Sequence, residues 1–434
     1  MNTTKLKAGV FAITITLAAP GFAIEVAEGC TGSQAAVDKN IFNWRYYLNS
    51  NADVAGAGVK TASAACTHWL NHGLPAGRQA HPGFHSSQYL ARYPDLLAAF
   101  GKTNYIAAVN HYIQLGIPEG RIGYQDNGIS LGYQTTTISN QVDTSKIFMG
   151  ISKRTAGAVD SLMFDNVEFI NATDHGRELQ IAGVSSWEEG YNPTEAGSCN
   201  DGSGYATSSS LNTLIFKPNS LFTSVTPAFW RKPGNTFCGL GNNTTTSAEN
   251  YRFHKNISIG EIPGMPNVIH YAIQVDINEH VPQDPRNSYM RFELPTAYHG
   301  GDFNRMFQFN KENSTLIEIT NLSCMIGGAC ASENSLIYAT ANLSHALGVC
   351  AGREAGADFA ARERYLAFGN LDNSSPFAST TKWSVVRYIH GNVSPGTVLN
   401  FNSYLAIAKT LDNVSAVDRV KLNLNELHQT GHCI

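Results

Sequence analysis

The stretch from Ile269 to Ile277 reads IHYAIQVDI and gives the clearest indication of how this chain folds. Its odd positions are all apolar, whereas His270, Gln274 and Asp276 fall between them. Successive side chains of a strand point to opposite faces of a sheet, so this alternation predicts a β-strand with one buried face. The polar face that carries His270 and Asp276 either lines a ligand groove or is a solvated outer face.

Similar short apolar or alternating runs recur through residues 131–434, and turn residues separate them. Many short strands at such spacing favour a β-sandwich or a β-barrel over an alternating α/β fold. We therefore predict a mainly β domain of the sandwich type over residues 131–434. Besides 269–277, the expected strands are 147–151, 161–164, 167–170, 211–216, 290–294, 316–319, 383–389 and 398–408.

One helix is expected near the end of this domain. Asp412 is the predicted N-cap, because its side chain can accept a hydrogen bond from the first turn. Five apolar residues follow at helical spacing and fall on one face, namely Val414, Val417, Val420, Leu424 and Leu427. That pattern predicts an amphipathic helix.

An internal repeat organises residues 24–130. FNWRYYLNSNAD (42–53) matches FHSSQYLARYPD (84–95), and HWLNHGLPAGR (68–78) matches HYIQLGIPEGR (111–121). Each copy is predicted to hold two short helices, the first stopping before the Asn-Ala-Asp or Tyr-Pro-Asp turn. The second ends at Gly73 or Gly116, each placed as a left-handed C-cap. Units of this length bury their apolar faces against neighbours, which predicts a small all-α module.

The pattern FxxxxYLxxxPDL followed by HYxxxGxxEGR resembles a short tandem repeat common in large secreted bacterial proteins. The first copy departs from it at Ala52 and Ala76. The resemblance implies an accessory module for structure or attachment. His68 and His72 lie four residues apart on a predicted helix, but the second copy has Leu115 in place of His72, so packing is favoured over metal binding.

The N-terminus has the features of a cleavable export signal over residues 1–23. Lys5 and Lys7 precede a mostly apolar run, and Gly21-Phe22-Ala23 offers small residues at the cleavage positions. That run is too short to span a bilayer, and no later stretch is long and apolar enough to do so. We therefore expect a secreted or periplasmic protein without a membrane span. Removing the two lysines takes the net charge from -4 to -6, which gives no footprint for nucleic acid.

The eight cysteines all lie after residue 23, and in an oxidising compartment they are expected to form disulfides. We predict Cys30–Cys66 and Cys199–Cys238, with Cys324, Cys330, Cys350 and Cys433 pairing among themselves. A zinc site is the rival interpretation, but no CxxC occurs. We expect neither a metal nor another cofactor.

The densest polar stretch is NATDHGRELQIAGVSSWEEGYNPTEAGSCND, residues 171–201. Loops that combine a histidine, an arginine, carboxylates and aromatic residues often carry function. Aromatic rings offer flat apolar faces to sugar rings, and arginine donates to carboxylates. The alternative is a loop whose carboxylates cap turns and pair with Arg177. The candidate binding residues are Asp174, Gln180, Trp187, Glu189, Asn192, His270 and Asp276.

The segment GAVDSLMFDNVEFINATDHGRELQ (157–180), with its N-x-x-D-x-G stretch, resembles the early strands of galactose-mutarotase-like supersandwich proteins. It is also similar to bacterial exported proteins that carry HGRxLQ and NPTEAGS stretches. This resemblance implies a β-sandwich with a concave, glycan-binding sheet, often in an epimerase, lyase or glycosidase. His175, Arg177, Tyr191 and Glu195 match the kinds of residue that such proteins use for catalysis.

Two functions stay open. A glycan-active enzyme would use Glu195 or Glu189 as acid or base with His175 or His270, and Arg177 would neutralise a substrate carboxylate. A non-catalytic protein would bind a polysaccharide or a cell-surface glycan through the β-domain and attach through the helical repeats. A secreted protease is disfavoured, because HExxH is absent.

Overall fold

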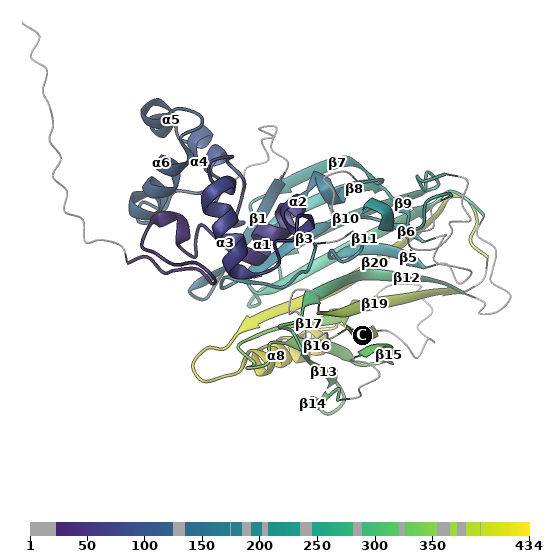
Figure 1. Ribbon diagram of the computed structural model, residues 1–434. Coiled ribbons are helices and arrows are strands. Elements are labelled where there is room, and N and C mark those ends of the chain that lie inside the picture. Colours follow the sequence, from purple (N-terminus) through teal and green to yellow (C-terminus); the bar gives the residue numbers. More distant parts are fainter. Residues whose placement is uncertain are drawn as a thin grey trace, which may run out of the picture.

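The structure is a computed structural model. It describes residues 23–124, 135–173, 175–184, 192–201, 207–234, 245–280, 289–320, 326–353, 365–370, 379–390 and 392–434. Helices occupy the first part of this chain, strands dominate the second, and one long helix follows the last strand (Figure 1). The predicted fold class, a β-sandwich with a small α-helical N-terminal module, is confirmed.

The helical module contains two similar units, each with three short α-helices, the third continued by a π-helical turn, where two helices were predicted (Figure 1). The extra helix begins where the sequence predicted a turn. In the second unit Pro94 occupies its first turn, where a missing N–H costs nothing. After the short 3-10 helix η1 (Ala35–Val37), the elements are α1 (Trp44–Ser50), α2 (Ala52–Gly56), α3 (Ala62–His68), η2 (Trp69–Gly73), α4 (Ser86–Arg92), α5 (Pro94–Phe100), α6 (Tyr105–His111) and η3 (Tyr112–Gly116).

The predicted C-cap role of Gly73 and Gly116 is wrong. Neither has a positive φ, and the left-handed residues are Gly77 and Gly120, both at 69°. A Cβ on Gly116 would lie 2.3 Å from the hydroxyl of Tyr89, and Gly73 meets a tyrosine of its own unit at the same distance. These glycines therefore allow a close tyrosine contact.

Each unit also joins that tyrosine to a histidine. Tyr47 Oη lies 2.7 Å from His68 Nδ1, and Tyr89 Oη lies 2.9 Å from His111 Nδ1. The packing role expected of these histidines agrees with this contact. The predicted disulfide Cys30–Cys66 is present and ties the start of the module to α3.

The β-domain consists of three antiparallel sheets. All nine predicted strands overlap observed ones. The four-stranded sheet has the order β1 (Thr135–Val142), β2 (Ser145–Ser152), β3 (Val159–Phe164), β4 (Val167–Glu168). The nine-stranded sheet runs β14 (Thr315–Glu318), β13 (Arg305–Asn310), β16 (Ser335–Ala339), β17 (His345–Ala351), β20 (Thr397–Lys409), β11 (Val268–Ile277), β10 (Tyr251–Ile259), β8 (Ser220–Thr226), β7 (Ser210–Lys217). The seven-stranded sheet runs β15 (Ile326–Ser332), β18 (Tyr365–Asn370), β19 (Thr380–His390), β12 (Tyr289–Gly300), β5 (Gln180–Val184), β6 (Pro193–Thr194), β9 (Ala228–Phe229).

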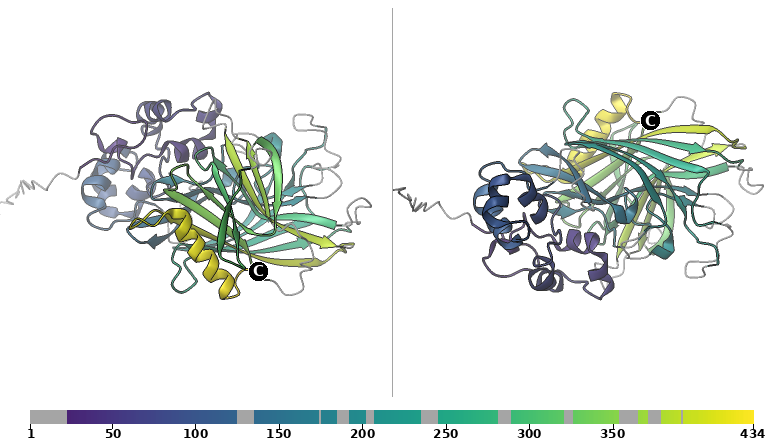
Figure 2. Two further views of the ribbon diagram at one scale, coloured as in Figure 1. Left: turned by 90° about the horizontal axis from the view of Figure 1, so that it is seen from below. Right: turned by 90° about the horizontal axis from the view of Figure 1, so that it is seen from above.

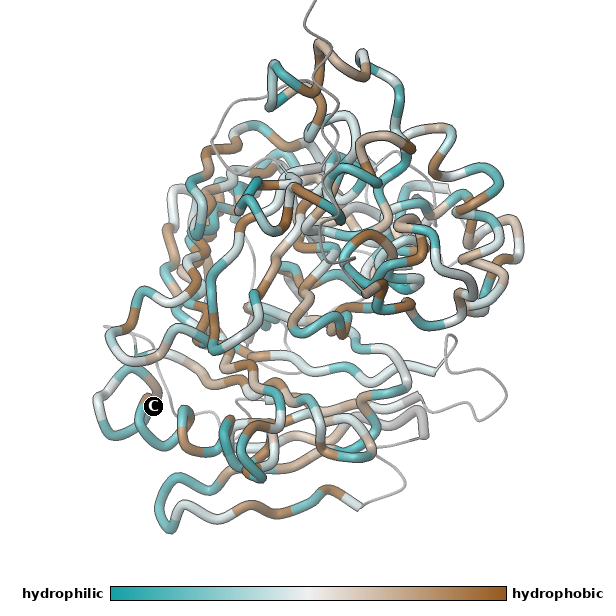
Figure 3. Tube along the Cα trace, turned by 90° about the vertical axis from the view of Figure 1, so that its left-hand side faces the viewer, coloured by the Kyte–Doolittle hydropathy of each residue, from teal (hydrophilic) through white to brown (hydrophobic). Residues whose placement is uncertain are grey.

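The two larger sheets share one apolar core, which makes the domain a sandwich (Figure 2). The odd-numbered side chains of β11, such as Tyr271 and Ile273, enter this core as predicted. Phe292 of β12 and Trp383 of β19 enter it from the seven-stranded sheet. Figure 3 shows hydrophobic and hydrophilic residues alternating along the chain, as expected for strands with one buried face.

The C-terminal helix α8 (Ala416–Gln429) packs on β16, β17 and β20 of the nine-stranded sheet. Four of the five predicted apolar residues are buried, but Val414 is 41% exposed. The predicted cap is also wrong, since Ser415 accepts from the N–H of Asp418, whereas Asp412 has a φ of 51°. A Cβ on Gly348 would lie 2.4 Å from Val420, so this glycine lets the helix approach the sheet.

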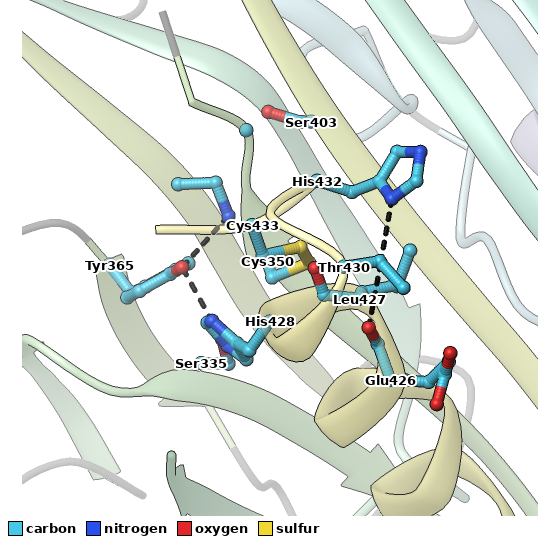
Figure 4. The surroundings of a disulfide bond; sticks show 12 residues. Ser335, Cys350, Tyr365, Ser403, Glu426, Leu427, His428, Thr430, His432 and Cys433 are labelled. Carbon is cyan, nitrogen blue, oxygen red and sulfur yellow. Dashed lines mark hydrogen bonds between the residues drawn. A yellow bond between two sulfur atoms is a disulfide. The ribbon is translucent and has the colours of Figure 1, made fainter. Parts of the chain in front are cut away.

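A disulfide between Cys350 of β17 and Cys433 fixes the end of the chain beside α8 (Figure 4). It falls within the predicted set of four cysteines. Cys199 and Cys330 are disulfide-bonded as well. Cys238, the predicted partner of Cys199, lies outside the described residues. Among the residues described, no helix is long and apolar enough to cross a membrane.

Candidate functional site

A cavity of about 420 Å³ opens on the face of the seven-stranded sheet that points away from the shared core. The assignment of the face follows from alternation along β12, where Phe292 enters the core while Arg291 and Glu293 line the cavity. The lining residues are Gly176, Gln180, Ala182, Asn192, Thr194, Trp230, Arg291, Glu293, Thr296, Tyr298, Leu366, Phe368, Lys382 and Ser384.

A β-bulge in β12 brings more of its polar residues onto this face. Glu293 and Thr296 are three positions apart, yet their partners Val386 and Ser384 on β19 are only two apart. One extra residue therefore lies in β12 near Pro295. A proline has no N–H that could donate a hydrogen bond to the neighbouring strand, so it is tolerated at such a bulge. Without the bulge, Glu293 and Thr296 would point to opposite faces.

An ion pair crosses the floor of the cavity. Glu293 Oε2 lies 2.9 Å from Lys382 Nζ on the neighbouring strand. Burial opposes the charge on both groups, but their mutual attraction outweighs it. The pKa of Glu293 is therefore lowered and that of Lys382 raised. Both groups are charged at neutral pH.

Arg291 adds a second positive charge beside this pair. Its Nε is buried, and its guanidinium makes no hydrogen bond or ion pair with any residue in the described part of the chain. The lining thus contains two cations and one carboxylate, and that carboxylate is already paired. Buried donors without partners are costly, so the arrangement favours an anionic or acceptor-rich ligand.

Three aromatic residues border the same space, namely Trp230, Tyr298 and Phe368. Trp230 is held by its backbone, which donates to Asn192 O at 2.8 Å and accepts from Cys199 N at 3.0 Å. Its ring lies against Gly176, where a Cβ would come within 2.4 Å of the indole. Tyr298 faces Lys382, whose Nζ lies 5.4 Å from the centre of the phenol ring. The indole of Trp230 is therefore held in place by contacts within the protein.

Two of the residues proposed from sequence line this cavity, namely Gln180 and Asn192. Gln180 Oε1 accepts from Ala196 N at 3.0 Å. Its other amide atom, Nε2, makes no hydrogen bond with the described residues and is a further donor for the cavity. Arg177 does not line the cavity, but its carbonyl accepts from Tyr298 N at 3.0 Å.

His175 and Glu195, proposed as catalytic, lie in the interior and not in the cavity. His175 Nε2 lies 2.9 Å from the carbonyl of Arg154. Glu195 contacts the fully buried Lys255, and its Oε2 accepts from Ile181 N at 3.0 Å. Asp174, Trp187, Glu189 and Tyr191 lie outside the described residues.

The remaining candidates belong to the nine-stranded sheet. His270 Nδ1 lies 2.5 Å from Glu261, and its Nε2 lies 2.8 Å from Asn402. Asp276 lies 3.1 Å from His254 Nε2. Neither residue lines the cavity, so the structure brings together only part of the proposed set.

Sequence reasoning missed Arg291, Glu293, Lys382 and Trp230. The predicted strand 290–294 already placed Arg291 and Glu293 on one face by alternation. The approach of Lys382 depends on the pairing of β12 with β19, which no local pattern indicates. Within the described ranges, no group of three or more histidine, cysteine or acidic residues is arranged to hold a metal.

No family model and no curated protein matches this chain. Among solved structures, a putative aldose 1-epimerase from Escherichia coli K12 is similar over 64% of this chain and 100% of its own, with 8% identity and a TM-score of 0.36. The heparan sulfate lyase HepC from Pedobacter heparinus covers 80% of this chain and is itself covered over 47%, with 8% identity and a TM-score of 0.38. The GH36 α-galactosidase AgaA from Geobacillus stearothermophilus covers 68% and is covered over 43%, with 8% identity and a TM-score of 0.37. This chain thus spans about half the length of the latter two proteins. Similarity at these TM-scores carries no argument about activity.

Proposed function

We propose that the cavity on the seven-stranded sheet binds an acidic saccharide, and that the chain is an exported glycan-recognition protein. The observation that carries this proposal is the guanidinium of Arg291, which lines the cavity with a buried Nε and no partner among the described residues. Arginine matches the planar geometry of a carboxylate or sulfate through paired N–H donors.

The aromatic border supports a sugar as the bearer of that acidic group. Trp230 and Tyr298 give the cavity flat apolar surfaces next to polar donors. Gln180 can donate to a ring hydroxyl or carbonyl from the same wall. A cavity of about 420 Å³ falls in the range of about 300–1,000 Å³ usual for small-ligand sites, so it would hold a short part of a glycan chain.

Recognition is favoured over acid–base catalysis by the state of the charged pair. Glu293 has a lowered pKa, which makes it a poor proton donor, and Lys382 has a raised pKa, which makes it a poor base. A glycan-active enzyme is the second candidate. The export signal and the disulfides support a location outside the cytoplasm.

The test is a binding and turnover screen of the protein against polygalacturonate, heparan sulfate and a neutral galactan. We expect acidic glycans to bind, and Arg291→Ala to weaken that binding at least tenfold while Arg291→Lys keeps part of it. Arg305→Ala is the matched control, because Arg305 is an arginine of the other sheet already paired with Glu318. Equal affinity for acidic and neutral glycans would contradict the proposal.

Turnover is followed in the same samples by new reducing ends and by absorbance of unsaturated products. Binding without products supports recognition. Products that disappear in His175→Ala or Glu195→Ala, in samples that circular dichroism shows to be folded, would instead establish the enzyme with the catalytic residues expected from sequence.

A further inference from the structure

A second cavity lies at the seam between the helical module and the β-domain. Figures 1 and 2 place the helices beside β1 and β3. The cavity has a volume of about 620 Å³. It shares no lining residue with the cavity on the seven-stranded sheet. It is therefore a separate site, and clefts between domains are common places for ligands.

The turn between β3 and β4 holds the two walls of this cavity in place. Asp165 and Asn166 have φ angles of 49° and 64°, as in a two-residue hairpin turn. Asn43 Nδ2 donates to the carbonyl of Asn166 at 2.8 Å. The N–H of Gly83 donates to His81 Nδ1 at 3.0 Å, so His81 carries its proton on Nε2 and donates to Asn166 Oδ1 at 3.2 Å. Burial lowers the pKa of His81 to about 4, so this neutral form persists at physiological pH.

The floor of the cavity is aromatic. Phe148 of β2 meets the ring of His81 at 5.8 Å and that of Tyr124 at 5.6 Å, both edge-on. Tyr112 lines the same space and stacks on Phe84 with 4.6 Å between ring centres. These packed rings are fixed in position, and they offer flat apolar surface to a ligand.

The rim of the cavity is basic on both walls. Lys39 and Arg121 come from the helical module, and Lys146 and Lys409 come from the β-domain. Asp165 is the one carboxylate in the lining. The lining thus holds four cations and one carboxylate, and three carboxylates outside the lining, Glu25, Asp95 and Glu119, pair with Lys39 and Arg121. The ammonium of Lys146 is the rim cation without an ion pair among the described residues, and it favours an anionic group.

Three of the four rim cations form ion pairs, and most of their partners are exposed. Arg121 lies 2.9 Å from Asp95 and 2.5 Å from Glu119, whose side chains are 58% and 46% exposed. Lys39 lies 2.5 Å from Glu25, but both side chains are exposed, at 41% and 66%, and exposed pairs are weak. Lys409 lies 2.9 Å from Asp165. Lys146 forms no ion pair with the residues that the structure describes. An anionic ligand can therefore recruit Lys146 and the weakly paired Lys39 and Arg121, whereas Lys409 stays with Asp165 and Ser145.

We propose that the seam is a second ligand site and that it binds a short acidic oligosaccharide. The basic rim selects the acidic groups, and the aromatic floor selects the sugar rings over a free inorganic anion. This site goes beyond the proposed function and does not depend on it. A chain with two sites would hold one glycan at two points or two glycans at once, which raises avidity without new contacts.

The test is a calorimetric titration with trigalacturonate of the wild type, Arg291→Ala and Lys146→Glu, with inorganic phosphate as a separate titrant. Lys146 is an exposed residue of β2 whose side chain forms no ion pair with the described residues, and circular dichroism of Lys146→Glu checks that the fold is kept. Lys311→Glu, a charge reversal in the loop between β13 and β14, is the matched control. We expect the seam to bind in Arg291→Ala, and Lys146→Glu to weaken that binding roughly tenfold. Lys311→Glu should not change it.

Hydrogen–deuterium exchange locates the ligand independently of these variants. Trigalacturonate should protect the backbone of residues 117–124 and 141–148 in Arg291→Ala. Protection confined to 176–184 and 291–298, or equal affinity in Lys146→Glu and wild type, would overturn the proposal. So would phosphate that binds as tightly as trigalacturonate, because the aromatic floor would then contribute nothing. If the seam binds and Arg291→Ala changes nothing elsewhere, the proposed function fails while this inference stands.

Discussion

Glu195 and Lys255 are expected to control stability rather than ligand contact. Both side chains are 0% exposed and form an ion pair. Lys255 Nζ also donates to the carbonyl of Gly157 at 2.6 Å, and Glu195 Oε2 accepts from Ile181 N at 3.0 Å. Glu195→Ala leaves the ammonium with one acceptor and the amide with none. Breaking a buried ion pair in this way costs about 3–5 kcal/mol.

Urea unfolding of the wild type, Glu195→Ala and the double variant Glu195→Leu/Lys255→Met measures this cost. The double variant should recover much of the loss, because apolar replacement of a buried pair is often neutral. Glu318→Ala is the control, since it removes an exposed pair with Arg305 and should cost about 1 kcal/mol or less. A loss below about 1 kcal/mol in Glu195→Ala would refute the reasoning.

The pH dependence of the same variant has a definite sign. Burial lowers the pKa of Lys255 below 10.5, and Glu195 counteracts this effect. Without Glu195 the pKa of Lys255 in the folded protein is lower still, and so further below its value in the unfolded chain. The free energy of unfolding of Glu195→Ala should therefore rise, relative to wild type, as the pH increases toward 10.5.

Three further predictions concern single residues. Burial raises the pKa of Glu168 from 4.5 to about 7, so between these pH values the folded state binds this proton and the unfolded chain does not. The free energy of unfolding of wild type, measured in urea relative to Glu168→Gln, should therefore fall by on the order of 3 kcal/mol as the pH rises from 4.5 to 7. Gly176→Ala places a Cβ within 2.4 Å of the Trp230 ring, so it should shift the tryptophan fluorescence and weaken the binding of acidic glycans. An unchanged fluorescence spectrum would contradict the contact between Gly176 and Trp230. Gly116→Ala would clash with Tyr89 and should lower thermal stability by about 1–3 kcal/mol.

The strands and the last helix were predictable because their signals are local. Alternation fixed the buried face of β11, and helical spacing fixed the buried face of α8. The boundaries were less predictable, because caps depend on a single backbone conformation. Asp412 has the side chain of an N-cap but lies at a φ of 51°, so Ser415 takes that place.

The cavity could not be derived in the same way, because it depends on which strands are neighbours. Gln180, Glu293 and Lys382 are far apart in sequence, and the order β19-β12-β5 brings them together. The bulge at Pro295 then turns Thr296 toward the same side. Each strand has a recognisable pattern, but the sequence of no single strand predicts the sheet order or the bulge.

The polar stretch 171–201 shows why a dense group of charged residues is an ambiguous signal. A ligand site and a buried ionic network need the same residue types, since each must hold charge in a partly dry environment. A buried ionic network differs from a ligand site because oppositely charged residues from elsewhere in the chain pair with its charged groups. Lys255 reaches Glu195, and Arg154 lies 3.7 Å from Glu178, so each of these carboxylates faces a cation from elsewhere in the chain. Arg291 makes no hydrogen bond or ion pair with the described residues, and the Glu293 carboxylate whose pKa it helps to lower is already paired with Lys382, so its guanidinium is the better indicator of where a ligand completes the structure.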